Sequence, residues 1–325
     1  MNHDRHRRAA HKTTKGFSLM ELMVAMVLGF IVIGGAISVY LASKRSLTEV
    51  DQVATLSENG RFALQLLGYS IRHIGFYGGP NPDRYYCKVN PSELCIPLQA
   101  PTGDCTGDAA AYDIGNSFFA LRATSATVEG CITDAMPDTD VLVIKNVGST
   151  PLSGGWSSQQ TYVIAGRVSF ELRDGADMPL DIGENNVAWP YQLQIYYIRD
   201  GAAPTLSRKI LAWDAVAGSM SIQTEDLVQG VENMRFRFGY DSNDDGEVDT
   251  LAYEEDVADA DWKNVVSLQV FLLLASDVID PSYTNEKTYQ LGDITVSPGD
   301  SVRRILLHSD ITLRNRRLVV RSGGQ

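Results

Sequence analysis

The sequence predicts an α+β protein in which one long N-terminal helix packs on an antiparallel β-sheet head. Residues 17–40 form an almost unbroken apolar run, and the apolar residues that follow recur in steps of three and four as far as residue 74. That spacing marks one face of a helix. Short runs rich in β-branched and aromatic residues then occupy residues 140–316. No helical pattern separates these runs, which argues against a parallel sheet.

The apolar run "FSLMELMVAMVLGFIVIGGAISVY" covers 24 residues, from Phe17 to Tyr40. A helix of that length is about 36 Å long, enough to cross a bilayer core of about 30 Å. A basic segment precedes it, as in export signals. We therefore expect four parts, which are a cytoplasmic leader (1–16), a transmembrane helix (17–40), its amphipathic continuation (41–75) and a β-rich periplasmic or extracellular head (76–325).

Charge is unevenly distributed along the chain. The net charge is −12, but residues 1–16 carry +4, which leaves −16 for residues 17–325. Phosphate contacts need Lys and Arg, so an acidic body argues against direct binding of nucleic acid. The same charge argues against attraction to anionic lipid surfaces.

Glu21 stands near the start of the apolar run. An ionised carboxylate within a transmembrane helix costs about 2.5–3.5 kcal/mol on insertion scales and usually has a partner. No Lys or Arg lies between Gly16 and Lys44. Cleavage after Gly16 would free the α-amine of Phe17, one helical turn before Glu21. The carboxylate can then pair with its own amine or with that of a neighbouring copy.

Four cysteines, Cys87, Cys95, Cys105 and Cys131, lie in a stretch rich in glycine and proline. In an exported chain, an even number of cysteines in one loop-rich stretch indicates two disulfides. We expect Cys87–Cys95 and Cys105–Cys131, since each pair joins near neighbours. Metal binding by these cysteines is the alternative.

The strand candidates are eight runs of alternating or continuous apolar residues. Two of them, 191–200 and 205–214, flank a turn with Gly and Pro and are expected to form a hairpin. The other runs are 140–146, 161–166, 168–173, 232–241, 264–276 and 303–316.

The stretch "DSNDDGEVD" has the spacing of a calcium loop. Hard oxygen donors at alternate positions let the chain curl around Ca²⁺, with glycine at the sixth position for the turn. Gly246 takes that sixth position. The candidate calcium ligands are Asp241, Asn243, Asp245, Glu247 (through its carbonyl) and Asp249.

This loop departs from the full calcium pattern at its end. The twelfth position, usually a bidentate Glu, is Ala252, although Glu254 and Glu255 follow closely and are candidate substitutes. We therefore expect weak affinity, on the order of 10⁻⁴–10⁻³ M. An acidic Asp-Gly hairpin turn without a metal is the alternative.

Catalytic patterns are absent from the sequence. Beyond the leader it has two histidines, His73 and His308, and it contains no G-x-S-x-G, H-E-x-x-H or Walker A pattern. We predict that the protein is not an enzyme, has no catalytic residues and requires no cofactor.

The basic leader, Gly16 and the "FSLMELMVAM" that follows resemble the class III signal of type IV pilins and pseudopilins. The resemblance implies a type IV pilin-like fold. It also implies that a prepilin peptidase cuts between Gly16 and Phe17 and N-methylates Phe17. Glu21 then becomes the residue that guides each subunit into the growing filament.

Two further stretches, "LSENGRFALQLLGYSIRHIGFYGG" (56–79) and "RRILLHSDITLRNR" (303–316), resemble the PilW family of minor pilins. Gly79 stands where many members have a cysteine. The resemblance implies a structural subunit that primes or caps pilus assembly and supports adhesion, twitching motility or DNA uptake. It implies a single-pass inner-membrane protein before assembly and a place in the pilus at the cell surface afterwards. The implied partners are other minor pilins, the major pilin, the prepilin peptidase and a tip adhesin.

Two other functions share parts of this pattern. A pseudopilin of a type II secretion system has the same signal and the same plan of helix and head. A membrane-anchored, calcium-dependent ligand-binding protein needs the helix only as an anchor, so Glu21 would then have no role in assembly.

Overall fold

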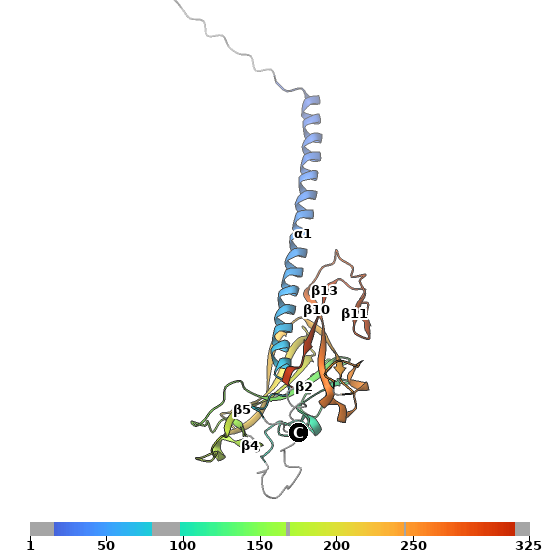
Figure 1. Cartoon of the computed structure of the whole chain (residues 1–325). Coiled ribbons are helices and arrows are strands. Elements are labelled where there is room, and N and C mark those ends of the chain that lie inside the picture. Colours follow the sequence, from blue (N-terminus) through green and yellow to red (C-terminus); the bar gives the residue numbers. More distant parts are fainter. Residues whose placement is uncertain (1–15, 80–97, 167–169, 244, 316–325) are drawn as a thin grey trace, which may run out of the picture. The chain divides into compact units, whose positions relative to one another are not determined.

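The computed structural model describes residues 16–79, 98–166, 170–243 and 245–315. The helix α1 (Leu19–Arg72) is unbroken (Figure 1) and matches the long helix expected from residue 17 to about residue 74. The chain divides into two compact units, one ending at Asp51 and the other beginning at Gln52. The second unit contains the end of α1 and all the strands.

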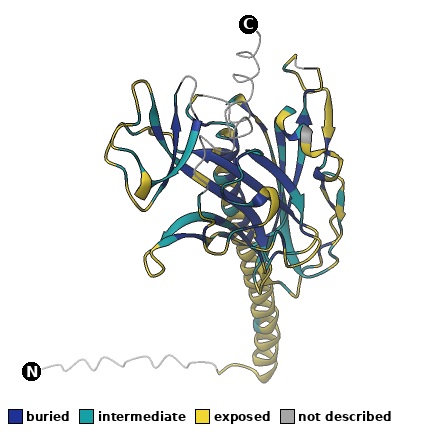
Figure 2. Ribbon diagram, turned by 90° about the horizontal axis from the view of Figure 1, so that it is seen from below, coloured by how far each residue is buried: buried dark blue, intermediate teal, exposed yellow. Residues whose placement is uncertain are grey.

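The first unit contains an apolar helix surface that nothing in the described chain covers. All its large apolar side chains, from Phe17 to Leu41, are exposed (yellow in Figure 2). This is the one helix among the described residues that is long and apolar enough to cross a membrane. Such a surface in water carries a large hydrophobic cost, so lipid or other helices must cover it.

In the second unit, α1 buries one face against the strands β10 (Val265–Ile279) and β13 (Val302–Thr312). Gly60 lies on this face, and a Cβ atom there would come within 2.3 Å of Leu307 Cδ1. Glycine usually weakens a helix, yet here it permits a close approach between helix and strand. The buried face consists of Gln52, Leu56, Gly60, Ala63, Leu67, Gly68, Ser70 and Ile71.

A seven-stranded antiparallel sheet forms one layer of the head. Its main path runs β1-β2-β5-β3-β4, and β6 and β7 extend it from β5. The predicted hairpin is confirmed, because β5 and β6 pair with Gln194 opposite Ile210. The strands are β1 (Phe118–Arg122), β2 (Asp140–Val147), β3 (Thr161–Ala165), β4 (Phe170–Asp174), β5 (Val187–Arg199), β6 (Thr205–Asp214) and β7 (Ser219–Gln229).

A four-stranded antiparallel sheet, in the order β13-β10-β8-β9, forms the other layer. A small hairpin, β11 and β12, packs its Leu291 with Leu273 of β10, on the opposite face from the main core. The α+β prediction is therefore confirmed. The remaining strands and 3₁₀ helices are β8 (Val231–Tyr240), β9 (Thr250–Ala252), β11 (Tyr289–Leu291), β12 (Ile294–Val296), η1 (Gly107–Ala109), η2 (Gly175–Asp177), η3 (Glu254–Asp256) and η4 (Asp259–Asn264).

A buried polar network fastens α1 to the seven-stranded sheet. The Ser70 hydroxyl lies 2.9 Å from Gln194 Oε1 and 2.7 Å from the Tyr196 hydroxyl. Arg208 donates to Gln194 at 3.1 Å and to the Glu225 carboxylate at 2.7 Å. Buried polar groups that find partners fix one arrangement of the elements that carry them. The network therefore fixes the end of α1 against β5 of the seven-stranded sheet.

Candidate functional site

The helix α1 begins with a capping box, in which the side chains of Ser18 and Glu21 accept backbone N–H groups of the first turn. The backbone N–H of Ser18 donates to Glu21 Oε2 at 2.9 Å, and the N–H of Met20 donates to Ser18 Oγ at 3.2 Å. The first four N–H groups of a helix have no carbonyl partner within the helix, and this arrangement provides acceptors for two of them. Glu21 thus has a partner within its own helix before any cleavage.

Ser18 was missed by the sequence reasoning, which considered Glu21 alone. The signal was present, because S-x-x-E ahead of an apolar run is the pattern of a capping box. The carboxylate also lies in the first helical turn, where the helix dipole favours negative charge. These two effects lower the cost of a charge at this end of an apolar helix.

The cysteine-bearing loops are held by one described disulfide, which joins Cys105 to Cys131 as predicted. Beside it, the N–H of Thr106 donates to the Glu129 carbonyl at 2.9 Å. The other predicted pair, Cys87–Cys95, lies outside the described residues.

The loop after Cys105 is fastened to the sheet by buried polar side chains rather than by strands. Lys145 of β2 is fully buried, and its Nζ donates to the carbonyls of Asp108 and Asp113. The Tyr191 hydroxyl donates to the Ala111 carbonyl between them. Burial lowers the pKa of Lys145 to about 8, while the charge of Asp113 opposes that shift. These bonds replace the regular ladder that this loop lacks.

Arg235 is the centre of the most concentrated charge cluster in the described head. Its guanidinium is fully buried and binds four carboxylates, each from a different position in the chain. Asp140 lies at 2.8 Å, Asp293 at 2.9 Å and Glu255 at 3.1 Å, and Glu254 also accepts a bond. All five N–H donors of the guanidinium are therefore used.

The cluster joins elements that are far apart in sequence. Arg235 lies on β8 of the four-stranded sheet, whereas Asp140 begins β2 of the seven-stranded sheet. Glu254 belongs to η3, and Asp293 to the turn between β11 and β12. The Tyr253 ring lies 4.6 Å from the guanidinium carbon, within the range of a cation–π contact. Arg235 thus connects both sheets, η3 and the small hairpin.

Negative charge exceeds positive charge in this cluster, and two of the carboxylates are buried. Burial raises the pKa of Asp140 to about 7; the Glu254 charge adds to this and Arg235 opposes it. Burial also raises the pKa of Glu254, against its hydrogen bond from Arg235. Glu254 Oε1 is buried without a described hydrogen-bond partner. Because Asp140 and Glu254 are both buried beside a single cation, the pair favours a state in which one of the two carboxylates keeps its proton.

The Asp-rich turn after β8 is tied together by its own backbone. The Asp241 carboxylate accepts from the N–H of Asn243 at 3.2 Å and of Gly246 at 2.5 Å. Asp245 accepts from the N–H of Glu247 at 2.8 Å. Gly246 has a positive φ of 88°, as the sharp turn requires. These backbone donors offset part of the repulsion between the acidic side chains.

The far side of the turn is held by Asp249, whose carboxylate accepts from the N–H and the hydroxyl of Ser242 at 2.8 and 2.7 Å. These bonds lower the pKa of Asp249. Within the described residues, which leave out position 244, no group of three or more His, Cys, Asp or Glu side chains could hold a metal ion. Calcium binding by Asp241, Asn243, Asp245, Glu247 and Asp249 stays a prediction.

Glu254 and Glu255 do not serve this turn. Both carboxylates bind Arg235 instead. In the sequence they follow the twelfth position of the calcium pattern closely. In the structure they belong to η3, and their carboxylates face the Arg235 guanidinium of β8. Any calcium site here therefore lacks a bidentate Glu from these two residues.

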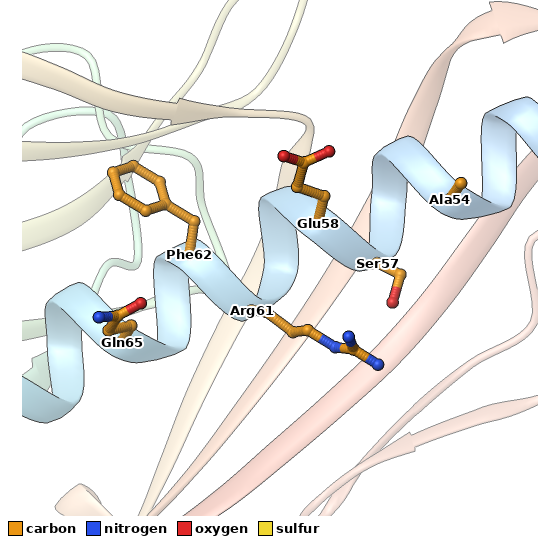
Figure 3. Close-up of a pocket in the computed structure, with 6 residues that line it drawn as sticks. All are labelled: Ala54, Ser57, Glu58, Arg61, Phe62 and Gln65. Carbon is orange, nitrogen blue, oxygen red and sulfur yellow. The ribbon is translucent and has the colours of Figure 1, made fainter.

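A shallow, open groove of about 590 Å³ lies along the outer face of α1 within the second unit (Figure 3). In the figure, Glu58 and Arg61 point away from each other, and Phe62 is half exposed. The groove is lined by Ala54, Ser57, Glu58, Arg61, Phe62 and Gln65. All its lining comes from one helix. Polar groups from different elements therefore do not point toward a common centre, as they do in a catalytic pocket.

Two family models match the chain. The model of the prokaryotic N-terminal methylation motif matches residues 11–37, which include the capping box. The model described as type IV pilus-assembly protein W, PilW, matches residues 195–315, from β5 to the residues after β13. Over these residues the chain is similar to the PilW family. The stretch 56–79 that also resembles this family lies outside both matches.

Comparison with solved structures finds a type IV-like pilin from Thermus thermophilus. It shares 11% sequence identity, covers 81% of this chain and 98% of its own, and has a TM-score of 0.36. No curated protein matches the chain.

These findings identify the chain as a minor pilin of a type IV pilus. Its signal and apolar helix place it in the inner membrane before assembly and in the pilus afterwards. Proteins of this family are structural subunits that undergo prepilin processing and associate with other pilus components.

We predict that the stability of the head falls as the pH rises from about 4 to about 7. The raised pKa of Asp140 means that the folded state holds a proton that the unfolded chain has already released. Its stabilisation is complete below the unfolded pKa of 3.8 and is lost by the time the pH passes about 7. Glu254→Gln removes the neighbouring charge that helps to raise the pKa of Asp140. The variant should therefore lose less stability over this pH range than the wild type, by about 1 kcal/mol or more.

The measurement is denaturant unfolding of the detergent-solubilised chain at a series of pH values. Glu255→Gln is the matched control, because its carboxylate is half exposed and should leave the slope nearly unchanged. Equal slopes in the wild type and in Glu254→Gln would contradict a retained proton in the Arg235 cluster.

Calcium binding is tested by calorimetric titration of the same preparation. We expect weak binding that Asp245→Ala abolishes, together with a calcium-dependent rise in the melting temperature of the wild type. Glu184→Ala, an exposed acid in the loop before β5, should bind calcium as the wild type does. The absence of both heat and a temperature shift in the wild type would leave the turn as an acidic hairpin.

Proposed function

We propose that a prepilin peptidase cuts this minor pilin between Gly16 and Phe17 and methylates Phe17. The apolar segment 17–40 then passes from the membrane into the core of the filament. Glu21 pairs with a freed α-amine and is the residue that guides assembly. This assignment of roles rests on the match of the methylation motif over residues 11–37 and on the position of each residue within it.

The observation that supports this proposal best is the combination of an uncovered apolar helix surface with a carboxylate in its first turn. Lipid covers the apolar side chains but provides no charge partner for Glu21. A filament core covers the same side chains with other helices and also brings α-amines close to the carboxylate. An anchor that stays alone in the membrane has no comparable use for Glu21.

The proposed role is structural, as a subunit that primes or caps the pilus together with other minor pilins, the major pilin and a tip adhesin. In this role it supports adhesion, twitching motility or DNA uptake. A non-enzymatic role is supported by the placement of the two histidines. His73 bonds to the Tyr69 carbonyl at 2.8 Å through Nδ1, and His308 stacks on Phe271.

Glu21→Ala tests the proposed assembly role. We expect the variant to accumulate in the inner membrane and to fall at least about tenfold in sheared pili, because losing one partner of a desolvated charge pair costs several kcal/mol. The measurement is quantitative immunoblotting of membrane and pilus fractions.

Glu58→Ala is the matched control, since it makes the same chemical change at an exposed position of the same helix. It should reach the pili at the wild-type level. Wild-type incorporation of Glu21→Ala would contradict the proposed role of Glu21 and favour a helix that serves only as an anchor.

A further inference from the structure

We propose that Ser18 is a positioning residue for assembly. Its hydroxyl fixes the first helical turn by accepting the N–H of Met20, and its backbone N–H holds one oxygen of Glu21. The other oxygen stays available for the α-amine of a neighbouring subunit. This inference rests on the proposed function, because it concerns how Glu21 meets its partner.

The two carboxylate oxygens of Glu21 have different surroundings. Oε2 accepts the N–H of Ser18 at 2.9 Å, while no hydrogen bond reaches Oε1 from the part of the chain that the structure describes. The side chain is exposed on the helix surface. A carboxylate has room for several donors, so occupation of Oε2 leaves Oε1 able to accept an amine.

The capping box survives the proposed cleavage. The N–H of Ser18 belongs to the peptide bond between Phe17 and Ser18, and the cut falls one bond earlier. The Ser18 hydroxyl, which accepts the N–H of Met20 at 3.2 Å, is also untouched. In lipid, the donors at the start of a helix have few other partners, so the box is worth more there than in water.

The capping box also sets the position of the Glu21 carboxylate along the helix axis. Glu21 lies four residues after Phe17, which is about 6 Å along a helix axis. By reaching back to the N–H of Ser18, the carboxylate comes to the level of the helix start. A neighbouring subunit in the same membrane carries its α-amine at this level. The capped carboxylate therefore meets the amine of a neighbour without either helix moving deeper.

The Ser18 hydroxyl does not touch Glu21, so its effect on the charge pair is indirect. By accepting the N–H of Met20 it fixes the first helical turn, and with it the backbone N–H of Ser18 that holds Glu21 Oε2. The benefit to the charge pair is preorganisation. A glutamate side chain without the box samples many rotamers and must give up that freedom when it binds. A capped glutamate has already lost much of it, which strengthens association with the amine. Thr and Asn preserve a cap, whereas Ala and Val do not.

The test uses full-length protein in piliated cells and compares Ser18→Ala, Ser18→Thr and Glu21→Ala. The two readouts are the processed fraction, measured by N-terminal mass, and the amount in sheared pili per processed subunit. We expect Ser18→Ala to be processed but to fall about fivefold in incorporation, the change expected from a lost cap. Ser18→Thr should restore the wild-type level.

A second pair, Ser18→Asn and Ser18→Val, compares a good cap with a poor one. Asn should incorporate like the wild type and Val like Ala. If Glu21→Ala fails to assemble while Ser18→Ala and Ser18→Val assemble normally, the inference is overturned and the proposed function stands. If Glu21→Ala itself assembles normally, the proposed function fails first. Loss confined to the processing step in Ala and Val would assign Ser18 to cleavage and overturn its role in assembly.

Discussion

The apolar surface at the start of α1 is the constraint on which the account depends, because nothing in the described chain covers it. Such a surface is stable only against lipid or against other apolar helices, and a pilin meets both in turn. This need explains why Glu21 has a local partner. The capping box with Ser18 satisfies the carboxylate while the helix is in lipid, and it leaves one oxygen available when other helices replace the lipid. The same few residues therefore suit two environments.

The head is held together by a different kind of interaction. Its two sheets share an apolar core with the end of α1, but directional contacts fix their arrangement. Arg235 connects both sheets, η3 and the β11–β12 hairpin, and the Ser70 network fixes α1 against the larger sheet. Truncating one member of such a buried cluster leaves the others unpaired, which costs more than the loss of a surface ion pair. These contacts therefore fix how the two sheets, the small hairpin and the end of α1 are arranged in the head.

The sequence predicted the helix and most of the long strands, because their apolar periods are strong. It missed β7, "SMSIQTEDLVQ", whose polar residues suit the edge of a sheet. It also missed the five-residue strand β1 and the three-residue strands, which are too short to carry a clear period. The alternation in "ENMRFRFGYD" correctly predicted the strand β8, in which Phe236 and Arg235 lie on opposite faces. Alternation does not reveal what covers each face, so the burial of Arg235 under η3 and the small hairpin could not be predicted. Glu254 and Glu255 were wrongly offered to the calcium pattern for the same reason.

The mass of the mature N-terminus tests the central claim most directly. Protein isolated from sheared pili should begin at Phe17 and carry an N-methyl group, and residues 1–16 should be missing. This result would show that the apolar helix is the processed helix of a pilin. A chain that keeps its Met1 leader in cells with an active prepilin peptidase would contradict the account, since an uncut helix never presents the α-amine that Glu21 requires.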